Sequence, residues 1–313
     1  MVRYILGRLI GIAGVLFAVS IMIFLIMHAI PGGPFDNSPA GKSEMPIPEH
    51  IRAKLLAQYG LDQPLHVQYV RYMLNALRGD LGVSFRTGEP VTAFIARTWP
   101  ITLTVGLIAL AIGAPIGIGM GLLASLRPNT WLDYLTSSVV VLTFVTPTVV
   151  IAILLIIVFS VTLRWLPTGG WGTAQQLILP VVVYALGIVG GLARFTRSGM
   201  VEALRTDYIR TAHAKGLAQR TVVFRHAFRN ASLPLVTMLG PIAVNMLVGS
   251  FFIEAIFRIP GIGAQMTLAT YNRDYPVIMA LALLWTGVLA LAYLLSDLMY
   301  AWVDPRIRLG ERS

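Results

Sequence analysis

Long apolar runs separated by shorter polar stretches dominate the pattern of this chain. A helix of about 20 apolar residues is needed to cross the hydrocarbon core of a bilayer. Six runs approach or exceed that length, at residues 9–30, 100–126, 135–163, 176–194, 233–257 and 277–302. A water-soluble core does not require unbroken apolar runs. The pattern therefore predicts an all-α integral membrane protein with six transmembrane helices.

Composition agrees with this prediction and excludes several other classes. Hydrophobic residues make up 56% and charged residues only 12% of the chain, about half the charged fraction of a soluble domain. The net charge of +10 could suggest nucleic acid. The basic residues, however, lie between apolar runs and at the chain ends, and no zinc-ligand spacing or aromatic–basic motif is present. We therefore expect contact with membrane lipid and none with nucleic acid.

The distribution of Lys and Arg predicts the orientation in the membrane. The N-terminus, 127–133, 194–232 and the C-terminal tail together carry 14, whereas the other side carries 10, seven of them in 31–99. Segments longer than about 60 residues cross a membrane largely regardless of charge. Without 31–99 the count is 14 against 3, so both termini are predicted to be cytoplasmic.

Four parts follow from these spans. Residues 1–30 form the N-terminus and an uncleaved first transmembrane helix, 31–99 an external helical cap, 100–302 a five-helix core containing the cytoplasmic loop 194–232, and 303–313 a cytoplasmic tail. Within the external segment, helical periodicity on both sides of Gln63–Pro64 predicts two helices packed as a cap on the membrane surface. Asp62 is the expected N-cap of the second helix, and Gly79 ends it.

Three glycines in the second span, Gly113, Gly117 and Gly121, form a small-xxx-small face. In lipid such a face favours close helix packing, either within this chain or against a partner.

Polar residues inside a span are costly unless they face a partner or a cavity. Asn245, Ser250 and Glu254 in the fifth span are therefore candidates for the lining of a translocation path. For Glu254 an alternative is a helical ion pair with Arg258, four residues later.

The cytoplasmic loop 194–232 is basic, with eight Lys and Arg against two acids, and is also well patterned. A helix is expected over 198–215, ending at Gly216, followed by a second over 218–230 that leads into the fifth span at Leu233–Pro234. One face of the first helix carries Met200, Leu204, Tyr208 and Thr211 with Ala212. This pattern predicts an ordered elbow that contacts a cytoplasmic partner through small side chains. An amphipathic helix resting on anionic lipid is the alternative.

Several apparent motifs do not support other chemistry. The stretch DNSPAGKS at 36–43 almost matches a nucleotide-binding loop, but Asp36 stands where glycine is required and Pro39 breaks the strand-to-helix context. The five histidines show no metal-ligand spacing, and no catalytic set is present. The chain is therefore predicted to hold no catalytic residue, metal or cofactor.

Five stretches together resemble the permease subunits of ABC importers for oligopeptides and dipeptides, in particular the B-type permease of each pair. They are GLDQPLHVQYVRYMLNALRGDLGVSF (60–85), DYIRTAHAKGLAQRTVVFRHAFRNASLPL (207–235), FFIEAIFRIPGIG (251–263), NRDYPV (272–277) and SDLMYAWVDPRIR (296–308). The second resembles the cytoplasmic EAA loop of that family, in which Arg210, Thr211 and Ala212 stand for Glu-Ala-Ala and Gly216 for the following glycine. Arg210 thus replaces the usual glutamate.

The resemblance implies a type I ABC importer permease fold in a prokaryotic inner or plasma membrane. It also implies a second, homologous permease as heterodimer partner, two ABC ATPase subunits that hold ATP and Mg, and an external binding protein. The implied ATPase-coupling residues are Tyr208, Arg210, Thr211, Ala212, Lys215, Gly216 and Leu217. A nickel- or opine-type permease remains an alternative on the same scaffold. A secondary transporter would require midplane carboxylates and an internal repeat, and a membrane-embedded enzyme would require a catalytic set; neither is visible.

Overall fold

The computed structural model describes residues 2–35 and 48–303. Within them the regular structure is helical, and loops and an isolated antiparallel bridge between Val83 and Pro90 connect the helices. The helices are α1 Val2–Ala29, α2 Glu49–Tyr59, α3 Leu65–Leu77, α4 Val91–Leu126, α5 Trp131–Val145, α6 Thr148–Leu155, the π-helix η1 Ile156–Thr162, α7 Ala174–Leu204, α8 Asp207–Ala214, α9 Gln219–Thr221, the π-helix η2 Val222–Phe228, α10 Arg229–Ala231, α11 Leu233–Val248, α12 Phe251–Ile256, α13 Ile262–Tyr271 and α14 Tyr275–Val303. The stretch 36–43 and the tail beyond residue 303 lie outside the described residues.

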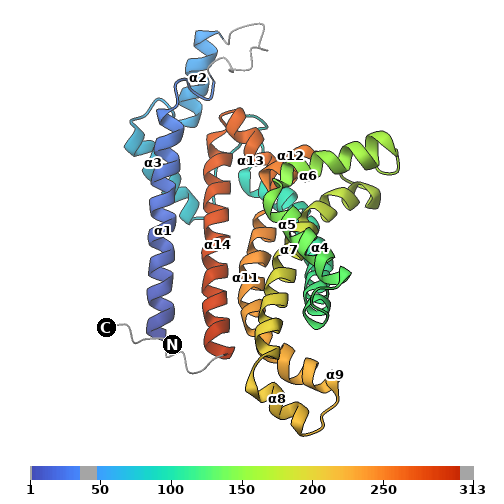
Figure 1. Ribbon diagram of the computed structural model, residues 1–313. Helices are drawn as coiled ribbons and strands as arrows, with labels where there is room; N and C mark the ends of the chain where they lie inside the picture. The colour runs from blue at the N-terminus through green and yellow to red at the C-terminus, as the bar shows by residue number, and fades with distance from the viewer. Residues whose placement is uncertain (1, 36–47, 304–313) are drawn as a thin grey trace.

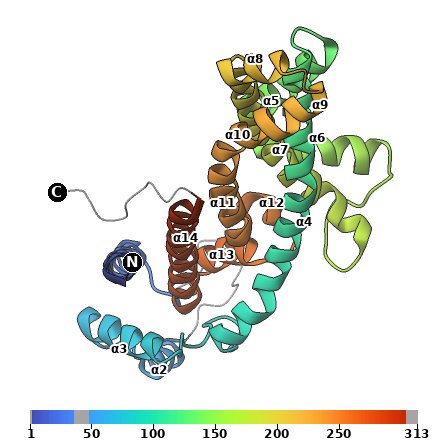
Figure 2. The same ribbon diagram turned by 90° about the horizontal axis from the view of Figure 1, so that it is seen from below.

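The long helices stand side by side in a row, with α1 at one edge, then α14 and α11, and then α4 with α7 (Figure 1). Viewed along the helices, α14 bridges α1 to the rest of the bundle (Figure 2). Helices α8 and α9 protrude at one end, which we call the elbow end, and α1 begins and α14 ends at that same end (Figure 1). We call the opposite end, which carries α2 and α13, the outer end. The charge count predicted that the N-terminus and the loop 194–232 lie on the same side of the membrane.

Five helices among the described residues are long and apolar enough to cross a membrane, and a sixth candidate span is broken. The run 135–163 was predicted as one span, and the structure divides it into two helices with a sharp bend between them. Trp131–Val145 and Thr148–Thr162 are bent by 109°. The break lies at Thr146, which has an extended conformation (φ −91°, ψ 122°), before Pro147. A proline disfavours helical geometry in the preceding residue and cannot donate a backbone hydrogen bond, so it ends the helix here.

The glycine face of the second span packs against α7, which confirms close helix packing and places it within this chain. A Cβ atom added to Gly113 would lie 3.1 Å from the carbonyl oxygen of Ala185, and one on Gly117 would lie 2.8 Å from that of Val189. At Gly121 the distance to the carbonyl oxygen of Ala193 would be 2.4 Å. Both sets of residues advance in steps of four, so the two backbones touch along one continuous line.

The segment between the first two spans differs from the predicted cap. Helix α3 begins after Pro64, and no side chain caps it, so Asp62 is not its N-cap. Helix α3 packs against α1 and not on α2. The contact is seen at the Tyr69 hydroxyl, which lies 2.7 Å from Ser20 Oγ. Helix α4 begins at Val91, so the boundary drawn between residues 99 and 100 falls inside a continuous helix. The division of the chain into four parts stays a prediction.

Candidate coupling elbow and permease site

The elbow consists of the end of α7, the short helix α8 and the helical segment 219–231. One helix was expected over 198–215, and the structure has two, because α7 runs on to Leu204 and the chain leaves helical geometry at Thr206 (φ −78°, ψ 155°) before α8. The second helix matches the prediction closely, running through α9, η2 and α10 without interruption. It passes through Ser232 into α11, so the elbow is joined directly to a transmembrane helix.

The elbow has a small apolar core of its own. Its buried residues are Met200, Ala203, Ile209, Ala212, Val222, Val223, Ala227 and Ala231. Leu122 and Leu126, at the end of α4, pack against this core. The elbow is therefore anchored on α4 as well as on α7 and α11, and it is an ordered part of the fold rather than a tether.

Six of the seven predicted coupling residues are exposed and one is not. The exposed residues are Tyr208, Arg210, Thr211, Lys215, Gly216 and Leu217. Ala212 is only 5% exposed and packs inward among the buried residues of the elbow. The break before α8 rotates it away from the surface, so its small side chain permits close packing inside the elbow instead of close approach by a partner.

Gly216 forms the turn after α8. Its φ of +71° is a left-handed conformation that side chains with a Cβ rarely adopt, and a Cβ there would have open space around it. The backbone NH of Gly216 donates to His213 O over 2.9 Å. Glycine is therefore required here by backbone conformation and not by lack of space.

An ion pair at the elbow end was not foreseen from the sequence. Arg197 Nε donates to Asp133 Oδ1 over 2.6 Å, and Arg197 Nη2 donates to Asp133 Oδ2 over 3.0 Å. Asp133 is 5% exposed and also accepts from the backbone NH of Asn129. This bidentate ion pair connects the start of α5 to α7 just before the elbow. Its partners are 64 residues apart, and no local pattern indicates the pairing.

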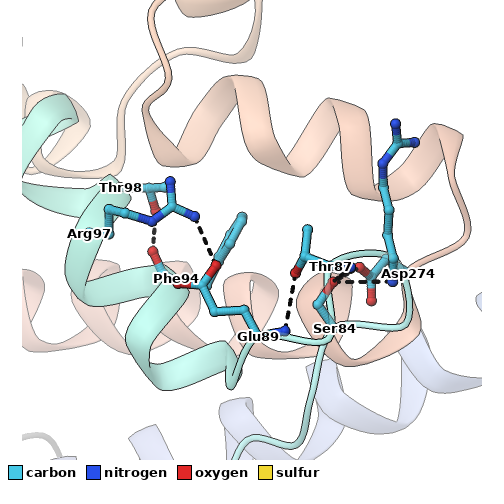
Figure 3. A network of polar contacts seen from close by, with 8 residues as sticks. Ser84, Thr87, Glu89, Phe94, Arg97, Thr98 and Asp274 are labelled. Carbon is cyan, nitrogen blue, oxygen red and sulfur yellow. Dashed lines mark hydrogen bonds and ion pairs between the residues drawn. The ribbon is translucent and has the colours of Figure 1, made fainter.

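At the outer end, two of the quoted motifs meet (Figure 3). Asp274, in the stretch NRDYPV, accepts from the Ser84 hydroxyl and from the backbone NH of Phe85 at 3.0 Å. Ser84 Oγ in turn accepts from the backbone NH of Thr87 at 3.1 Å. Asp274 and Ser84 are both buried. We call this contact the outer latch; it fastens the turn before α4 to the start of α14.

A third motif surrounds a buried carboxylate. Glu254 is 1% exposed, its Oε1 accepts from the Thr102 hydroxyl at 2.9 Å, and its Oε2 accepts from the backbone NH of Ala264 at 3.1 Å. The alternative of an ion pair with Arg258 is wrong. Helix α12 ends at Ile256 and Arg258 adopts a φ of 53°, so its side chain is exposed and lies off the helical i+4 position. Glu254 instead joins α4, α12 and α13.

The other two candidates for a translocation path differ from Glu254 in exposure. Asn245 is exposed on α11, and none of the hydrogen bonds among the described residues involves its side chain. Ser250 is half-buried, and its hydroxyl accepts weakly from the backbone NH of Ile253 at 3.4 Å. Of the three, Asn245 alone presents an unsatisfied polar group on the surface of a span.

A cavity of about 170 Å³ lies between α1, α3 and the outer latch. His28, Gln68 and Tyr72 line it, and His28 Nε2, Gln68 Oε1 and the Tyr72 hydroxyl have no hydrogen-bond partner among the described residues. Burial raises the pKa of the Tyr72 hydroxyl. A buried polar atom without a hydrogen-bond partner lowers the stability of the fold, because it has lost its hydrogen bonds to water and gained none in the protein.

The arrangement of helices is that of known transporters. A solved structure described as an amino acid ABC transporter with histidines has a TM-score of 0.54 at 18% identity, over 66% of this chain and 93% of that one. The methionine ABC transporter MetNI in inward-facing conformations has a TM-score of 0.52 at 19% identity, over 67% and 96%. The membrane-length helices and the ordered elbow therefore form a fold of the class that these two ABC transporters share, the type I fold.

The family within that class follows from the sequence comparisons. Residues 113–309 match the family described as binding-protein-dependent transport system inner membrane component, and residues 1–106 match its N-terminal counterpart. The chain belongs to this family.

Curated relatives cover the chain from end to end. The oligopeptide transport system permease protein OppB of Haemophilus influenzae is 37% identical over 98% of this chain and 100% of its own length. The dipeptide transport system permease protein DppB of Bacillus subtilis is 37% identical over the full length of both chains. The protein of the same name from Lactococcus lactis subsp. cremoris is 38% identical over 99% of this chain and 100% of its own length.

Proposed function

We propose that this chain is a permease subunit of an ATP-driven importer of short peptides and forms half of the translocation path. The observation that carries the proposal is the end-to-end similarity to relatives named for oligopeptide and dipeptide transport. A nickel- or opine-type substrate remains the second candidate, because the cargo of such importers depends largely on a separate binding protein.

The elbow is the part that we propose to contact two ABC ATPase subunits, which hold ATP and Mg and perform the hydrolysis. Tyr208 and Leu217 are 39% and 38% exposed. Lys215 adds positive charge beside them, while Arg210 pairs with Asp207 over 3.3 Å. Exposed apolar groups ringed by polar ones are typical of a protein interface. Ala212 belongs to the support of this surface and does not contact the partner.

The path is proposed to lie on the surface of α11 that carries Asn245, facing a homologous second permease. An exposed amide in a membrane span needs a polar neighbour or water, and a path between two subunits supplies both. Ser250 lies near this path, whereas Glu254 stabilises its wall. An external binding protein would deliver the substrate at the outer end, and the assembly would lie in a prokaryotic inner or plasma membrane.

The docking proposal can be tested with two matched threonines. Thr211, on the elbow, and Thr270, at the outer end, are both exposed helical residues whose hydroxyls donate to the carbonyl four residues earlier. Thr211→Glu should reduce co-purification of the ATPase subunits about tenfold, which corresponds to roughly 1.4 kcal/mol, whereas Thr270→Glu should not. Equal retention of the ATPases by both variants would contradict the proposed role of the elbow.

The substrate is tested separately in proteoliposomes that contain the assembled importer and its binding protein. We expect ATP-dependent uptake of labelled dialanine. Uptake of a nickel chelate and not of peptides would favour the second candidate, and uptake that needs an ion gradient but no ATP would contradict the ABC mechanism.

A further inference from the structure

The cavity between α1, α3 and the outer latch lies near the outer surface of the membrane. Its lining includes His28, the penultimate residue of α1, and Gly60, which ends α2. Helix α2 lies beyond the outer end of α1 (Figure 1). Its last residue, Tyr59, also lines the cavity, and the Tyr59 ring stacks on Phe35 at a centroid distance of 5.7 Å. The walls of the cavity are therefore shared by the end of a membrane span and the segment outside it.

Two of the unpartnered atoms in this cavity can only accept a hydrogen bond. Gln68 Nε2 donates to the carbonyl oxygens of Leu61 at 3.2 Å and Gln63 at 2.7 Å, which fixes the orientation of the amide and leaves Oε1 as the unpartnered end. His28 Nδ1 lies 2.8 Å from the carbonyl oxygen of Phe24. A carbonyl only accepts, so Nδ1 carries a proton, and Nε2 of the neutral ring is an acceptor.

These acceptors require a ligand that donates hydrogen bonds. The third unpartnered group, the Tyr72 hydroxyl, can accept as well as donate. A primary ammonium has three donors and would satisfy all three atoms. The rings of Phe24, Phe85 and Tyr275 form part of the wall, and aromatic rings attract an ammonium group to their faces. Hydrogen bonding and the aromatic wall thus favour the same chemical group.

The lining contains no acidic side chain, but Arg71 lies at its exposed edge. A Cβ atom on Gly60 would be 2.8 Å from Arg71 Nη1, so the guanidinium lies at the outer end of the cavity. Within the part of the chain that the structure describes, Arg71 forms no ion pair. A buried ammonium without a compensating negative charge is costly, and a carboxylate alone would meet the two acceptors. A zwitterion avoids both problems, because its carboxylate can bind Arg71 while its ammonium binds the acceptors.

Water alone would fill this cavity poorly. A volume of about 170 Å³ corresponds to about five or six water molecules at about 30 Å³ each, and each of them needs about two to four polar partners. Much of the wall is apolar, with Met27, Val83 and Met279 beside the aromatic rings, so most of these waters would lack partners. A cavity of about 150 Å³ accommodates benzene, and leucine without its carboxylate is of about that size.

We propose that this cavity binds a small apolar zwitterion, either an amino acid of about the size of leucine or a dipeptide. The ammonium binds His28 Nε2, Gln68 Oε1 and the Tyr72 hydroxyl, the apolar body contacts the wall, and the carboxylate binds Arg71. The ligand would join α1, α3 and the start of α14 beside the outer latch. None of the lining residues belongs to α11, so this site is separate from the proposed path and does not depend on the identity of the cargo.

The test is a titration of the membrane-embedded importer in nanodiscs with radiolabelled leucine. The external binding protein is left out, because it would itself bind peptides. Unlabelled leucine, dialanine, isopentylamine and 4-methylpentanoate are then added as competitors. Isopentylamine is leucine without the carboxylate, and 4-methylpentanoate is leucine without the ammonium group.

We expect saturable binding of leucine, with isopentylamine and 4-methylpentanoate each competing at least about tenfold more weakly, because each loses the hydrogen bonds of one charged group. If either competes as well as unlabelled leucine, the assignment of a zwitterion is wrong. The comparison of dialanine with leucine distinguishes the two sources. Stronger competition by dialanine assigns the site to peptides, and weaker competition assigns it to amino acids.

Two substitutions locate the bound ligand. Tyr72→Phe removes only the hydroxyl, and Arg71→Gln removes the positive charge, so each should weaken leucine binding about tenfold or more. Arg78→Gln, on the same stretch of chain but outside the cavity lining, is the control and should bind leucine as the parent does. Circular dichroism verifies that all three variants are folded. The absence of saturable binding would mean that the cavity holds only water, and unchanged affinity in both Tyr72→Phe and Arg71→Gln would place the leucine elsewhere. Either result overturns the proposal.

Discussion

Replacement of Gly121 by alanine should destabilise the protein, whereas the same change two residues earlier should not. A Cβ at Gly121 would lie 2.4 Å from the carbonyl oxygen of Ala193 and 3.0 Å from the backbone nitrogen of Arg197. A Cβ at Gly119, on the same helix, would have nothing within 4 Å. The two substitutions therefore differ only in what the new methyl group meets.

The magnitude follows from that difference. Ordinary carbon contacts lie at about 3.5–4.0 Å, so α4 and α7 must separate by about 1 Å at Gly121. Such overpacking costs about 1–3 kcal/mol. Both substitutions also gain up to about 1 kcal/mol of helix propensity, and this gain cancels in the comparison. Gly121→Ala should therefore be less stable than Gly119→Ala by about 1–3 kcal/mol.

The assay is unfolding of the purified permease in mixed micelles by increasing mole fractions of sodium dodecyl sulfate, followed by circular dichroism. Gly119→Ala should equal or exceed the parent in stability. If the two variants unfold at the same mole fraction, the contact between α4 and α7 does not constrain the helices as the distances imply. Gly121 also lies near the elbow, so we expect its replacement to lower substrate-stimulated ATP hydrolysis in the complete importer.

Two further predictions concern buried polar groups at the outer end. Glu254→Ala leaves the Thr102 hydroxyl and the NH of Ala264 without their acceptor. Since each unsatisfied buried group costs about 1–3 kcal/mol, the free energy of unfolding should fall by about 2–6 kcal/mol, while Arg258→Ala should change it by less than about 0.5 kcal/mol. Similar losses in both variants would mean that the two residues do form an ion pair. Tyr72→Phe removes a buried hydroxyl that has no partner, so stability should be unchanged or higher by about 1 kcal/mol, and a loss above that size would reveal an unseen hydrogen bond. Burial raises the pKa of this hydroxyl above its unfolded value of about 10. The unfolded chain therefore releases this proton first, and the parent loses stability as the pH rises past about 10. The Phe variant has no such proton and should lose less stability between about pH 9 and 11.

The features that could be predicted from the sequence are those that depend on runs and periodic spacing. The apolar runs identified every membrane-length helix, and the four-residue spacing of Gly113, Gly117 and Gly121 indicated close packing. The elbow was predicted because its basic residues and the helix end at Gly216 are local signals. Pro147 was also visible, but an apolar run of 29 residues over 135–163 concealed that it breaks the span.

Pairings over long sequence distances could not be predicted. Asp274 contacts Ser84 across 190 residues, and Glu254 contacts Thr102 across 152. A buried acid does not show in a sequence whether a hydroxyl, a backbone NH or an arginine satisfies it, and the nearest cation, Arg258, was the wrong partner. The inward position of Ala212 was missed for a related reason: the break at Thr206 rotates α8, and a single-helix pattern places Ala212 on the opposite side.

The packing of the elbow indicates how its movement would reach the membrane part. Segment 219–231 leads directly into α11. If this were the connection between the elbow and the membrane helices, a movement of the elbow would displace α11 alone. The elbow core, however, also includes Leu122 and Leu126 of α4, and Arg197 ties the adjoining part of α7 to Asp133. Helices α4 and α7 touch backbone to backbone at Gly121, so neither can slide along the other without a clash. A displacement of α8 should therefore move α4, α7 and α11 together as one body, and the Thr102–Glu254 contact at the far end of α4 would transmit that movement to α12 and α13.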